Sequence, residues 1–505
     1  MKRIRKICTW VMIIALLCGL FPAAPTMAAK KKAKKVTLSS KKLTITKGKS
    51  KTLKVKNAKK KVKWKVISGK KNITIKKKNA KSITIKGKKK GTAKVRATVG
   101  KTKLTCKVTV KDVKKTNTGS SNSSKTTDDE AALKKMIAEQ RAAGASVREN
   151  IKDDWQYKWD EKGRLIEIRW VGCRIKGKVS FSTFTALEKL DCSSNQISSL
   201  DVSKNTALTS LRCEENQLSS LDVSKNTALT TLDCLHNQLS SLNVSKNTVL
   251  KTLYCYNNQL SSLDVSKNTA LTTLDCMDNQ LRSLNLSKNT ALKNLNCRGN
   301  KLSSLDLSHN MALKELNCMY NQLESLDISK HTDFVQLHCE GNQLISLDVS
   351  HDTALKYLSC NDNQLSSLDV STNTAIEELG CMNNQLSSLD VSANINLEWL
   401  SCENNQLGSL DVSANVNLEG LNCASNRLSS LDVSQNMRLV YLHCYHNQLS
   451  SLDVSKNLML AHLTCENNQI SSLDVSKNIW LNFLSCDADV IVTGCSDSII
   501  TRVES

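Results

Sequence analysis

The sequence repeats itself every 21 residues over most of its length. Cysteine marks the period, because the series that begins with Cys192, Cys213 and Cys234 continues without a slip to Cys486, fifteen cysteines in all. The unit that starts at Leu187 reads Leu-x-x-Leu-x-Cys-x-x-Asn-x-Ile-x-x-Leu-x-Val-x-x-Asn. A fixed period of this size indicates a solenoid of stacked coils, since one unit cannot bury its own apolar face.

Alternation within the unit predicts which side chains point inward. Leu190 and Cys192 alternate with polar neighbours, as expected of a short strand whose other residues face outward. We expect Leu200 and Val202 to line the return side, and Asn195 to turn the chain and satisfy backbone groups there. Parallel strands lie about 4.8 Å apart, so fifteen coils extend roughly 70 Å.

This unit resembles the leucine-rich repeat, with cysteine at the third leucine position. The match runs from about Ile168 to Ile491, and the irregular first repeat carries Ile168, Trp170, Cys173 and Ile175 at the equivalent sites. It is similar to the unit of bacterial surface leucine-rich-repeat proteins, including the internalins. The resemblance implies an α/β-type repeat solenoid, with a parallel β-sheet on its concave face, that binds other macromolecules.

Residues 29–112 form a separate, strongly basic segment. Residues 29–115 hold 35 Lys or Arg against one acidic residue, Asp112, and their apolar residues alternate with Lys or Thr. This pattern predicts an all-β sandwich of seven or eight strands. The segment resembles bacterial immunoglobulin-like domains of group 2, which implies a surface spacer or an adhesive module. The matching pieces are 36–38, 62–66, 87–95 and 106–110.

The rest of the chain divides by composition. Residues 1–28 have a basic head, an apolar stretch from Cys8 to Phe21 and a small-residue cleavage site at Ala28, so a signal peptide is predicted rather than a membrane anchor or a lipidated Cys18. Residues 113–127 are predicted to be a flexible linker. We expect a helix and a hairpin in 128–186 to cap the repeats of 187–488, and a second cap at 489–505.

The cysteine column has two interpretations. An oxidising compartment favours disulfides, but cysteines stacked in register have parallel Cβ vectors, which fit a bridge poorly. We therefore expect buried, unpaired thiols, with an isolated bridge at Cys173 or Cys495 as the alternative, and no metal along the column because its ligands do not converge.

Two further sets of residues could bind a metal. The ladder that begins at Asp201 and Asp222 is expected to cap backbone N–H groups, with calcium between coils as the alternative. His443, His446 and His462 fall on outward positions and could hold zinc, although histidines that face solvent or a partner are the first expectation.

The outward strand positions carry six of the seven tyrosines. Aromatic residues anchor interfaces, so we predict a ligand-binding surface there; the alternative is that aromatics accumulate because the position is exposed and permissive. The main strip is predicted at the C-terminal end of the repeats, and a second site is predicted at Tyr254, Tyr256 and Tyr320. The candidate residues are Tyr254, Tyr256, Tyr320, Tyr357, Trp399, Tyr441, His443, Tyr445, His446, His462 and Phe483.

Charge and motifs limit the function. The formal charge of the chain is +26, so the part that follows the basic segment is acidic overall. We expect a protein or glycan ligand on the repeats and an anionic cell-wall polymer on the basic segment, with nucleic acid disfavoured by export. No catalytic or cofactor motif stands apart from the repeat. The prediction is a secreted or wall-associated, non-enzymatic monomer that does not span the membrane, with a structural spacer as the alternative.

Overall fold

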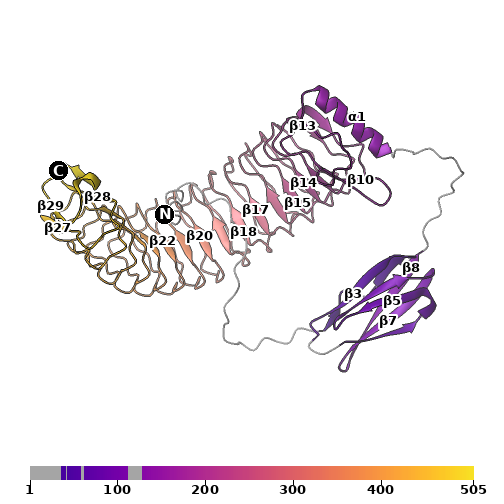
Figure 1. The fold of residues 1–505 in the computed structure, drawn as a ribbon, viewed down its shortest axis with the longest axis horizontal. Coiled ribbons are helices and arrows are strands. Elements are labelled where there is room, and N and C mark those ends of the chain that lie inside the picture. The colour runs from indigo at the N-terminus through magenta and orange to yellow at the C-terminus, as the bar shows by residue number, and fades with distance from the viewer. Residues whose placement is uncertain (1–35, 41, 59–61, 112–127, 505) are drawn as a thin grey trace. The chain divides into compact units, whose positions relative to one another are not determined.

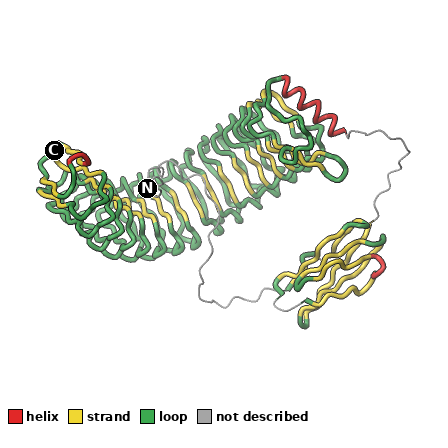
Figure 2. Tube along the Cα trace, viewed as in Figure 1, coloured by secondary structure: helices red, strands yellow, loops and turns green. Residues whose placement is uncertain are grey.

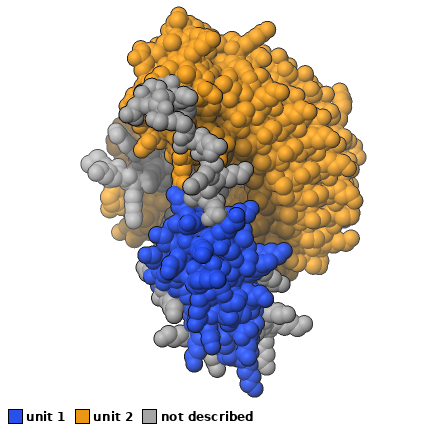
Figure 3. All heavy atoms as spheres, turned by 90° about the vertical axis from the view of Figure 1, so that its right-hand side faces the viewer, with its two compact units in different colours: residues 1–123 blue, residues 124–505 orange. Residues whose placement is uncertain are grey.

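The computed structural model describes residues 36–504 apart from 41, 59–61 and 112–127. The chain divides into two compact units, Met1–Ser123 and Ser124–Ser505 (Figure 3). The predicted signal peptide at 1–28 and most of the predicted linker lie outside the described residues. Among the described residues, no helix combines the length and the apolarity needed to cross a bilayer.

The first unit is a sandwich of two four-stranded sheets. The order in one sheet is β1 (Thr37–Leu38), β3 (Ser50–Lys56), β6 (Ser82–Gly87) and β5 (Ile73–Lys78). The order in the other is β2 (Lys42–Thr46), β8 (Thr102–Lys111), β7 (Gly91–Val99) and β4 (Lys63–Ser68), with β2 parallel to β8. A short 3-10 turn, η2 (Lys70–Asn72), precedes β5. Apolar residues at alternate strand positions, such as Leu53, Ile85 and Val108, are buried between the sheets.

The second unit begins with a helix and a hairpin that cover the first coil. Helix α1 (Asp128–Ala142) buries Leu133 and Ile137, and the Asp129 carboxylate accepts a hydrogen bond of 2.9 Å from the Leu165 backbone N–H. Strand β9 (Tyr157–Trp159) pairs antiparallel with β10 (Leu165–Arg169), and β10 pairs in parallel with the first repeat strand. The hairpin therefore closes one end of the apolar interior.

One parallel sheet runs the length of the solenoid (Figure 1), with each short strand pairing in register with the strand one coil later. The repeat strands are β12 (Lys189–Asp191), β14 (Ser210–Arg212), β15 (Thr231–Asp233), β16 (Thr252–Tyr254), β17 (Thr273–Asp275), β18 (Asn294–Asn296), β19 (Glu315–Asn317), β20 (Gln336–His338), β21 (Tyr357–Ser359), β22 (Glu378–Gly380), β23 (Trp399–Ser401), β24 (Gly420–Asn422), β25 (Tyr441–His443), β26 (His462–Thr464) and β28 (Phe483–Asp487). Strand β30 (Ile500–Val503) follows β28 in parallel.

The return side consists of loops and turns rather than helices (Figure 2), which corrects the α/β label. Within residues 128–504, α1 is the one α-helix, and the unit is better described as a β-solenoid. Short extra strand pairs flank the array: β11 (Lys176–Ser180) with β13 (Gln196–Asp201), and β27 (Ser472–Asp474) with β29 (Ile491–Thr493). A 3-10 turn, η3 (Asp497–Ile499), precedes β30.

Side chains on the return side explain why no helix forms there. The Asp201 carboxylate accepts a hydrogen bond of 3.0 Å from the Ser203 backbone N–H, and Asn243 accepts the same bond from Ser245. This local turn competes with helical hydrogen bonding. The bond to Ser203 is also the backbone-capping role that the sequence predicts for the aspartate ladder. Among the described residues, no group of His, Cys, Asp and Glu is arranged to hold a metal ion.

An asparagine in every coil joins that coil to the preceding one. The Asn321 Oδ1 accepts a hydrogen bond of 3.1 Å from the Leu302 backbone N–H, and its Nδ2 donates at 3.0 Å to the carbonyls of Cys297 and Cys318. The same pattern occurs at Asn216 and continues to Asn468. These side chains satisfy backbone groups that the short coil leaves without partners.

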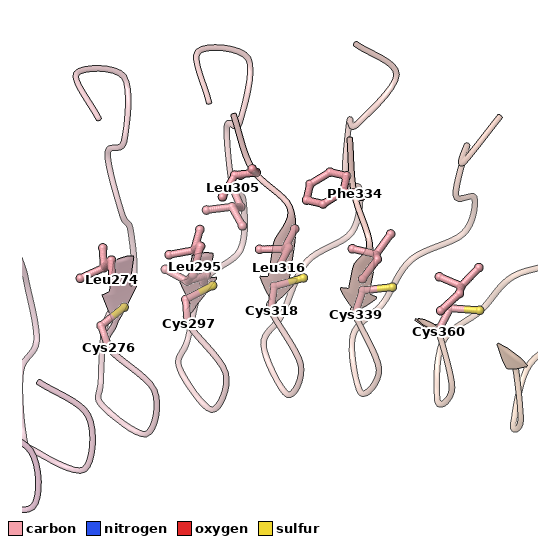
Figure 4. Close-up of a cluster of buried hydrophobic side chains, with 14 of the residues drawn as sticks. Leu274, Cys276, Leu295, Cys297, Leu305, Leu316, Cys318, Phe334, Cys339 and Cys360 are labelled. Atoms are coloured by element: carbon pink, nitrogen blue, oxygen red, sulfur yellow. The ribbon is translucent and has the colours of Figure 1, made fainter. Parts of the chain in front are cut away.

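The column cysteines are buried and carry free thiols. In Figure 4 the sulfur atoms of successive coils lie in a row and point the same way, beside the leucines. The Cys213 Sγ donates to the Asp233 carbonyl of the next coil at 3.4 Å. Burial raises the pKa of the Cys318 and Cys360 thiols to about 12, so the reactive thiolate is absent at neutral pH.

Candidate functional site

Four predicted residues form one continuous stack of rings on the exposed face of the sheet. The ring centroids of Trp399 and Tyr441 lie 5.7 Å apart, those of Tyr441 and His462 lie 5.0 Å apart at an interplanar angle of 17°, and those of His462 and Phe483 lie 6.0 Å apart. These residues occupy the first position of β23, β25, β26 and β28. We call them the aromatic strip. In-register pairing places them in one line, as the sequence predicts.

A glycine allows the strip to cross a whole coil. Gly420 occupies the same position on β24, between Trp399 and Tyr441. A Cβ atom at Gly420 would lie 2.2 Å from Cε3 and Cζ3 of Trp399, so the indole ring lies directly against the glycine. The absence of a side chain there lets Trp399 lean over β24 and reach a ring two coils away.

The Tyr445 side chain likewise reaches across a whole coil. Its hydroxyl donates a hydrogen bond of 2.6 Å to the Glu403 carboxylate, two coils before it, and the residue at the equivalent position between them is the small, buried Ala424. Burial and this carboxylate raise the pKa of Tyr445 to about 12. His446 follows in the left-handed turn, with a φ of 50°, and packs edge-on against the Tyr445 ring.

Carboxylates border the aromatic strip on its N-terminal side. Tyr357 lies two coils before Trp399 and donates a hydrogen bond of 3.0 Å to Glu377. Burial and the nearby Glu377, Glu378 and Glu398 raise the pKa of Tyr357 to about 12. Glu378, between the two rings, is itself held in a partly buried position, and burial and its acidic neighbours raise its pKa.

The three candidate histidines have separate partners. His462 belongs to the ring stack, and His446 packs against Tyr445. The His443 Nδ1 lies 2.8 Å from the Thr464 hydroxyl, and burial, followed by the charge of nearby His462, lowers the pKa of His443. Burial also lowers the pKa of His462, so both His443 and His462 favour the neutral form within the aromatic surface. Among the described residues, these three histidines do not form a group that could hold a metal ion.

The three tyrosines of the predicted second site separate into two places. Tyr256 lies one coil after His236 and packs edge-on against it, with ring centroids 5.3 Å apart. Tyr254 is the last residue of β16, two residues before Tyr256. Tyr320 lies three coils further along, roughly 14 Å away at the usual strand spacing. There the Arg298 guanidinium lies over its ring at 5.1 Å. The predicted second site is therefore not one cluster.

A group of carboxylates on the N-terminal coils, buried at Asp233 and half-buried at Glu214 and Asp275, was not predicted. Burial raises the pKa of Glu214 to about 7 and the pKa of Asp233 and Asp275 to about 6. The glutamates at 377, 398 and 419 were also missed, although they recur at one position in three successive units. Their recurrence is the signal in the sequence by which they could have been found.

The fold and this surface define a leucine-rich-repeat protein with an exposed aromatic surface on its parallel sheet. The solved functional domain of InlJ from Listeria monocytogenes, described as including a cysteine ladder, is 38% identical; the match covers 63% of this chain and 72% of that one, with a TM-score of 0.62. The chain therefore belongs to the internalin-like family of leucine-rich-repeat proteins.

More distant structures agree on the fold. YopM from Yersinia enterocolitica is 25% identical over 63% of this chain and 74% of its own, with a TM-score of 0.51. The plant peptide hormone receptor RGFR1, solved in complex with RGF2, is 17% identical over 67% of this chain and 68% of its own, with a TM-score of 0.56, and shows the fold alone. The sequence matches no profile of a known protein family and no curated protein. The neighbours support a scaffold for protein interaction.

Proposed function

We propose that this chain is a secreted or cell-wall-associated adhesin whose aromatic strip binds a basic segment of a protein ligand. The observation that carries the proposal is the ring stack itself. Four rings are packed face to face or tilted across five coils, on a solenoid whose return-side motif Ser-Ser-Leu-Asp-Val-Ser recurs with few changes. Pre-packed aromatic rings offer a large contact area that loses little entropy on binding.

The charge beside the strip indicates the chemistry of the ligand. Four glutamates lie at or beside Tyr357 and Trp399: Glu377, Glu378, Glu398 and Glu403. The two nearby cations are already engaged, because Lys356 pairs with Glu377 and Arg438 pairs with Glu419. Aromatic faces next to carboxylates favour Lys or Arg side chains through cation–π and ionic contacts. A basic polypeptide fits this surface better than an acidic glycan does.

The test is to pan a displayed peptide library against the full-length chain. We expect enrichment of peptides that contain Lys or Arg, and binding at least about tenfold weaker to the variant Trp399→Ala/Tyr441→Ala, because truncated anchors commonly lose 2 kcal/mol or more. Gly420→Ala is expected to weaken binding as well, since its Cβ would displace the Trp399 ring.

Gly408→Ala is the matched control, because a Cβ there meets no atom within 4 Å. It should bind like the wild type. Gly408→Ala and Trp399→Ala/Tyr441→Ala should melt near the wild-type temperature, since their side chains face solvent. The melting curve of Gly420→Ala, a buried position, shows whether displacing the Trp399 ring also perturbs the fold. Equal binding of the selected peptides to wild type and to Trp399→Ala/Tyr441→Ala would exclude the strip as the ligand site.

We infer that the basic unit is an immunoglobulin-like module that holds anionic wall polymers. Lys42, Lys107 and Lys94 lie directly opposite one another on β2, β8 and β7, which costs stability unless an anion compensates. A hollow of about 320 Å³ is lined by more lysines, including Lys47, Lys76 and Lys86. The one carboxylate of residues 29–115, Asp112, cannot balance so many cations.

Attachment to isolated cell walls should therefore depend steeply on salt. We expect the chain to sediment with walls at low ionic strength and to be released at moderate ionic strength, because each neutralised phosphate releases a counterion. The variant Lys94→Glu/Lys107→Glu should be released at lower salt than the wild type. Walls stripped of their anionic polymer provide the control, and undiminished attachment to them would contradict the proposal.

A further inference from the structure

The last five coils carry an exposed apolar residue at a position where most earlier coils carry threonine, Met311 being the exception. The position follows the buried asparagine that precedes each strand. It is occupied by Thr206, Thr227, Thr248, Thr269 and Thr290 in the first coils. In the last coils the exposed fraction of the residue at this position ranges from 49% to 81%. We call these five residues the aliphatic row: Ile395, Val416, Met437, Leu458 and Ile479.

The residues on one side of the row change with it. Two positions before the row, the first coils carry lysine, as at Lys204 and Lys225, but the residues beside Ile395 and Val416 are Ala393 and Ala414. Lysine returns at Lys456 and Lys477, beside the last two members of the row. One half of the row is therefore bordered by small side chains and the other half by long cationic ones.

The other side of the row shows the same division. Asn396 and Asn417 follow the first two members and fold down onto the preceding coil, where their Nδ2 atoms donate to the carbonyls of Thr374 and Ile395 at 3.0 and 3.1 Å. The last two members are followed by Met459 and Trp480, which are 53% and 64% exposed. We call the N-terminal half of this surface, which has short or folded-down side chains, the low half. We call the C-terminal half, where long side chains project into solvent, the raised half.

We propose that the aliphatic row is the interface of a homodimer in which two rows pack antiparallel about a two-fold axis at Met437. In this register the raised half of each copy meets the low half of its partner, as an isologous contact requires. Lys456 and Lys477 of one copy then face positions 414 and 393 of the other, which are alanines. In the same register, Met459 and Trp480 of one copy face positions 417 and 396 of the other, which are asparagines.

Size and shape both favour a second copy over other occupants. Burial of an aliphatic side chain removes roughly 100 Å² from water, so the seven exposed apolar side chains offer on the order of 400 Å² per copy. With a polar rim, two copies reach the size of small stable interfaces, about 1,200 Å² in total. In a parallel arrangement the two-fold axis would run along the row, so Lys456 and Lys477 would face Met459 and Trp480 of the other copy, long side chains against long side chains, and the small residues would face each other across a gap. The proposal replaces the monomer expected from the sequence.

Sedimentation equilibrium of the full-length chain over a range of concentrations tests the dimer. We expect a reversible monomer–dimer equilibrium that weakens at least about tenfold in Met437→Lys, because the two introduced charges would meet at the axis. Thr248→Lys is the matched control, at the same position of an earlier coil, and should associate like the wild type. A monomeric wild type at every concentration, or equal association of Met437→Lys and wild type, would overturn the proposal.

Cross-linking with a short bismaleimide tests the register in a Cys8→Ser/Cys18→Ser/Cys495→Ser background, because the column thiols are buried and unreactive. Met437→Cys should cross-link to itself. Ile395→Cys and Ile479→Cys should each fail alone and cross-link when mixed. Self-cross-linking of Ile479→Cys would contradict the antiparallel arrangement. The mass of the chain is measured without any peptide ligand, so failure here is distinguishable from failure of the aromatic strip.

Discussion

Replacement of Asn321 with alanine is expected to lower the free energy of unfolding of the repeat unit by about 4 kcal/mol. The substitution leaves the Leu302 N–H without its side-chain partner and removes one of the two amide donors to the Cys297 carbonyl, in a region where Asn321 is only 8% exposed. An orphaned buried polar group costs about 1–3 kcal/mol, and a small cavity adds to this. Denaturant unfolding followed by circular dichroism measures the loss.

The position of Asn321 near the middle of the array adds a second expectation. Repeat proteins are stabilised by contacts between neighbouring coils, so one weakened junction is expected to divide unfolding into two transitions. Gln322→Ala, at the adjacent exposed position, is the matched control and should change the free energy of unfolding by less than about 0.5 kcal/mol. Equal effects of the two substitutions would show that the asparagine ladder does not hold the coils together.

The variant Asp233→Asn/Asp275→Asn is expected to be more stable than the wild type at neutral pH, by about 3 kcal/mol. Burial raises the pKa of both carboxyls to about 6, so at neutral pH the fold holds two charges that it disfavours. Each unit of pKa shift corresponds to about 1.4 kcal/mol, and we take about half of the sum because both groups lie on a solvent-facing surface. Asparagine removes the charge and keeps one acceptor oxygen, which suffices for the bond from the Met277 backbone N–H, while the bond from Asn296 Nδ2 to Asp275 is lost.

The advantage of the variant should disappear as the pH falls. A carboxyl whose pKa is raised in the folded state binds its proton more tightly there, so its penalty on the fold grows as the pH rises from about 4 to about 6. Below about pH 4 both states are protonated and the two proteins should differ little. Buried histidines titrate identically in both proteins, so they cancel in the comparison.

Melting temperatures of the two proteins across this pH range measure the effect. The control is Asp222→Asn on the return side, where a backbone N–H and Ser224 lower the pKa of the aspartate. The chain already carries asparagine at the equivalent positions 243 and 285, so the control is compatible with the fold. It should show no gain at neutral pH. A difference between the buried-site variant and the wild type that is independent of pH would contradict the linkage.

The sequence predicted the coil, the inward column and the common line of the aromatic strip. A strict 21-residue period determines which residues share a column, and alternation along a strand determines which face they occupy. This reasoning placed Trp399, Tyr441, His462 and Phe483 together. It failed for Tyr320, which shares the face but lies three coils from Tyr254 and Tyr256, and it overestimated the helical content of the return side.

Periodicity by itself determined the column and the face of each side chain in the repeats. Only the tertiary structure decided which side chains touch along a column, because contact between coils depends on the size of the residue that lies between them. Gly420 lets Trp399 reach Tyr441, and Ala424 lets Tyr445 reach Glu403. Burial, and with it the raised pKa of Asp233 and Asp275, likewise depends on the neighbours that stacking brings together.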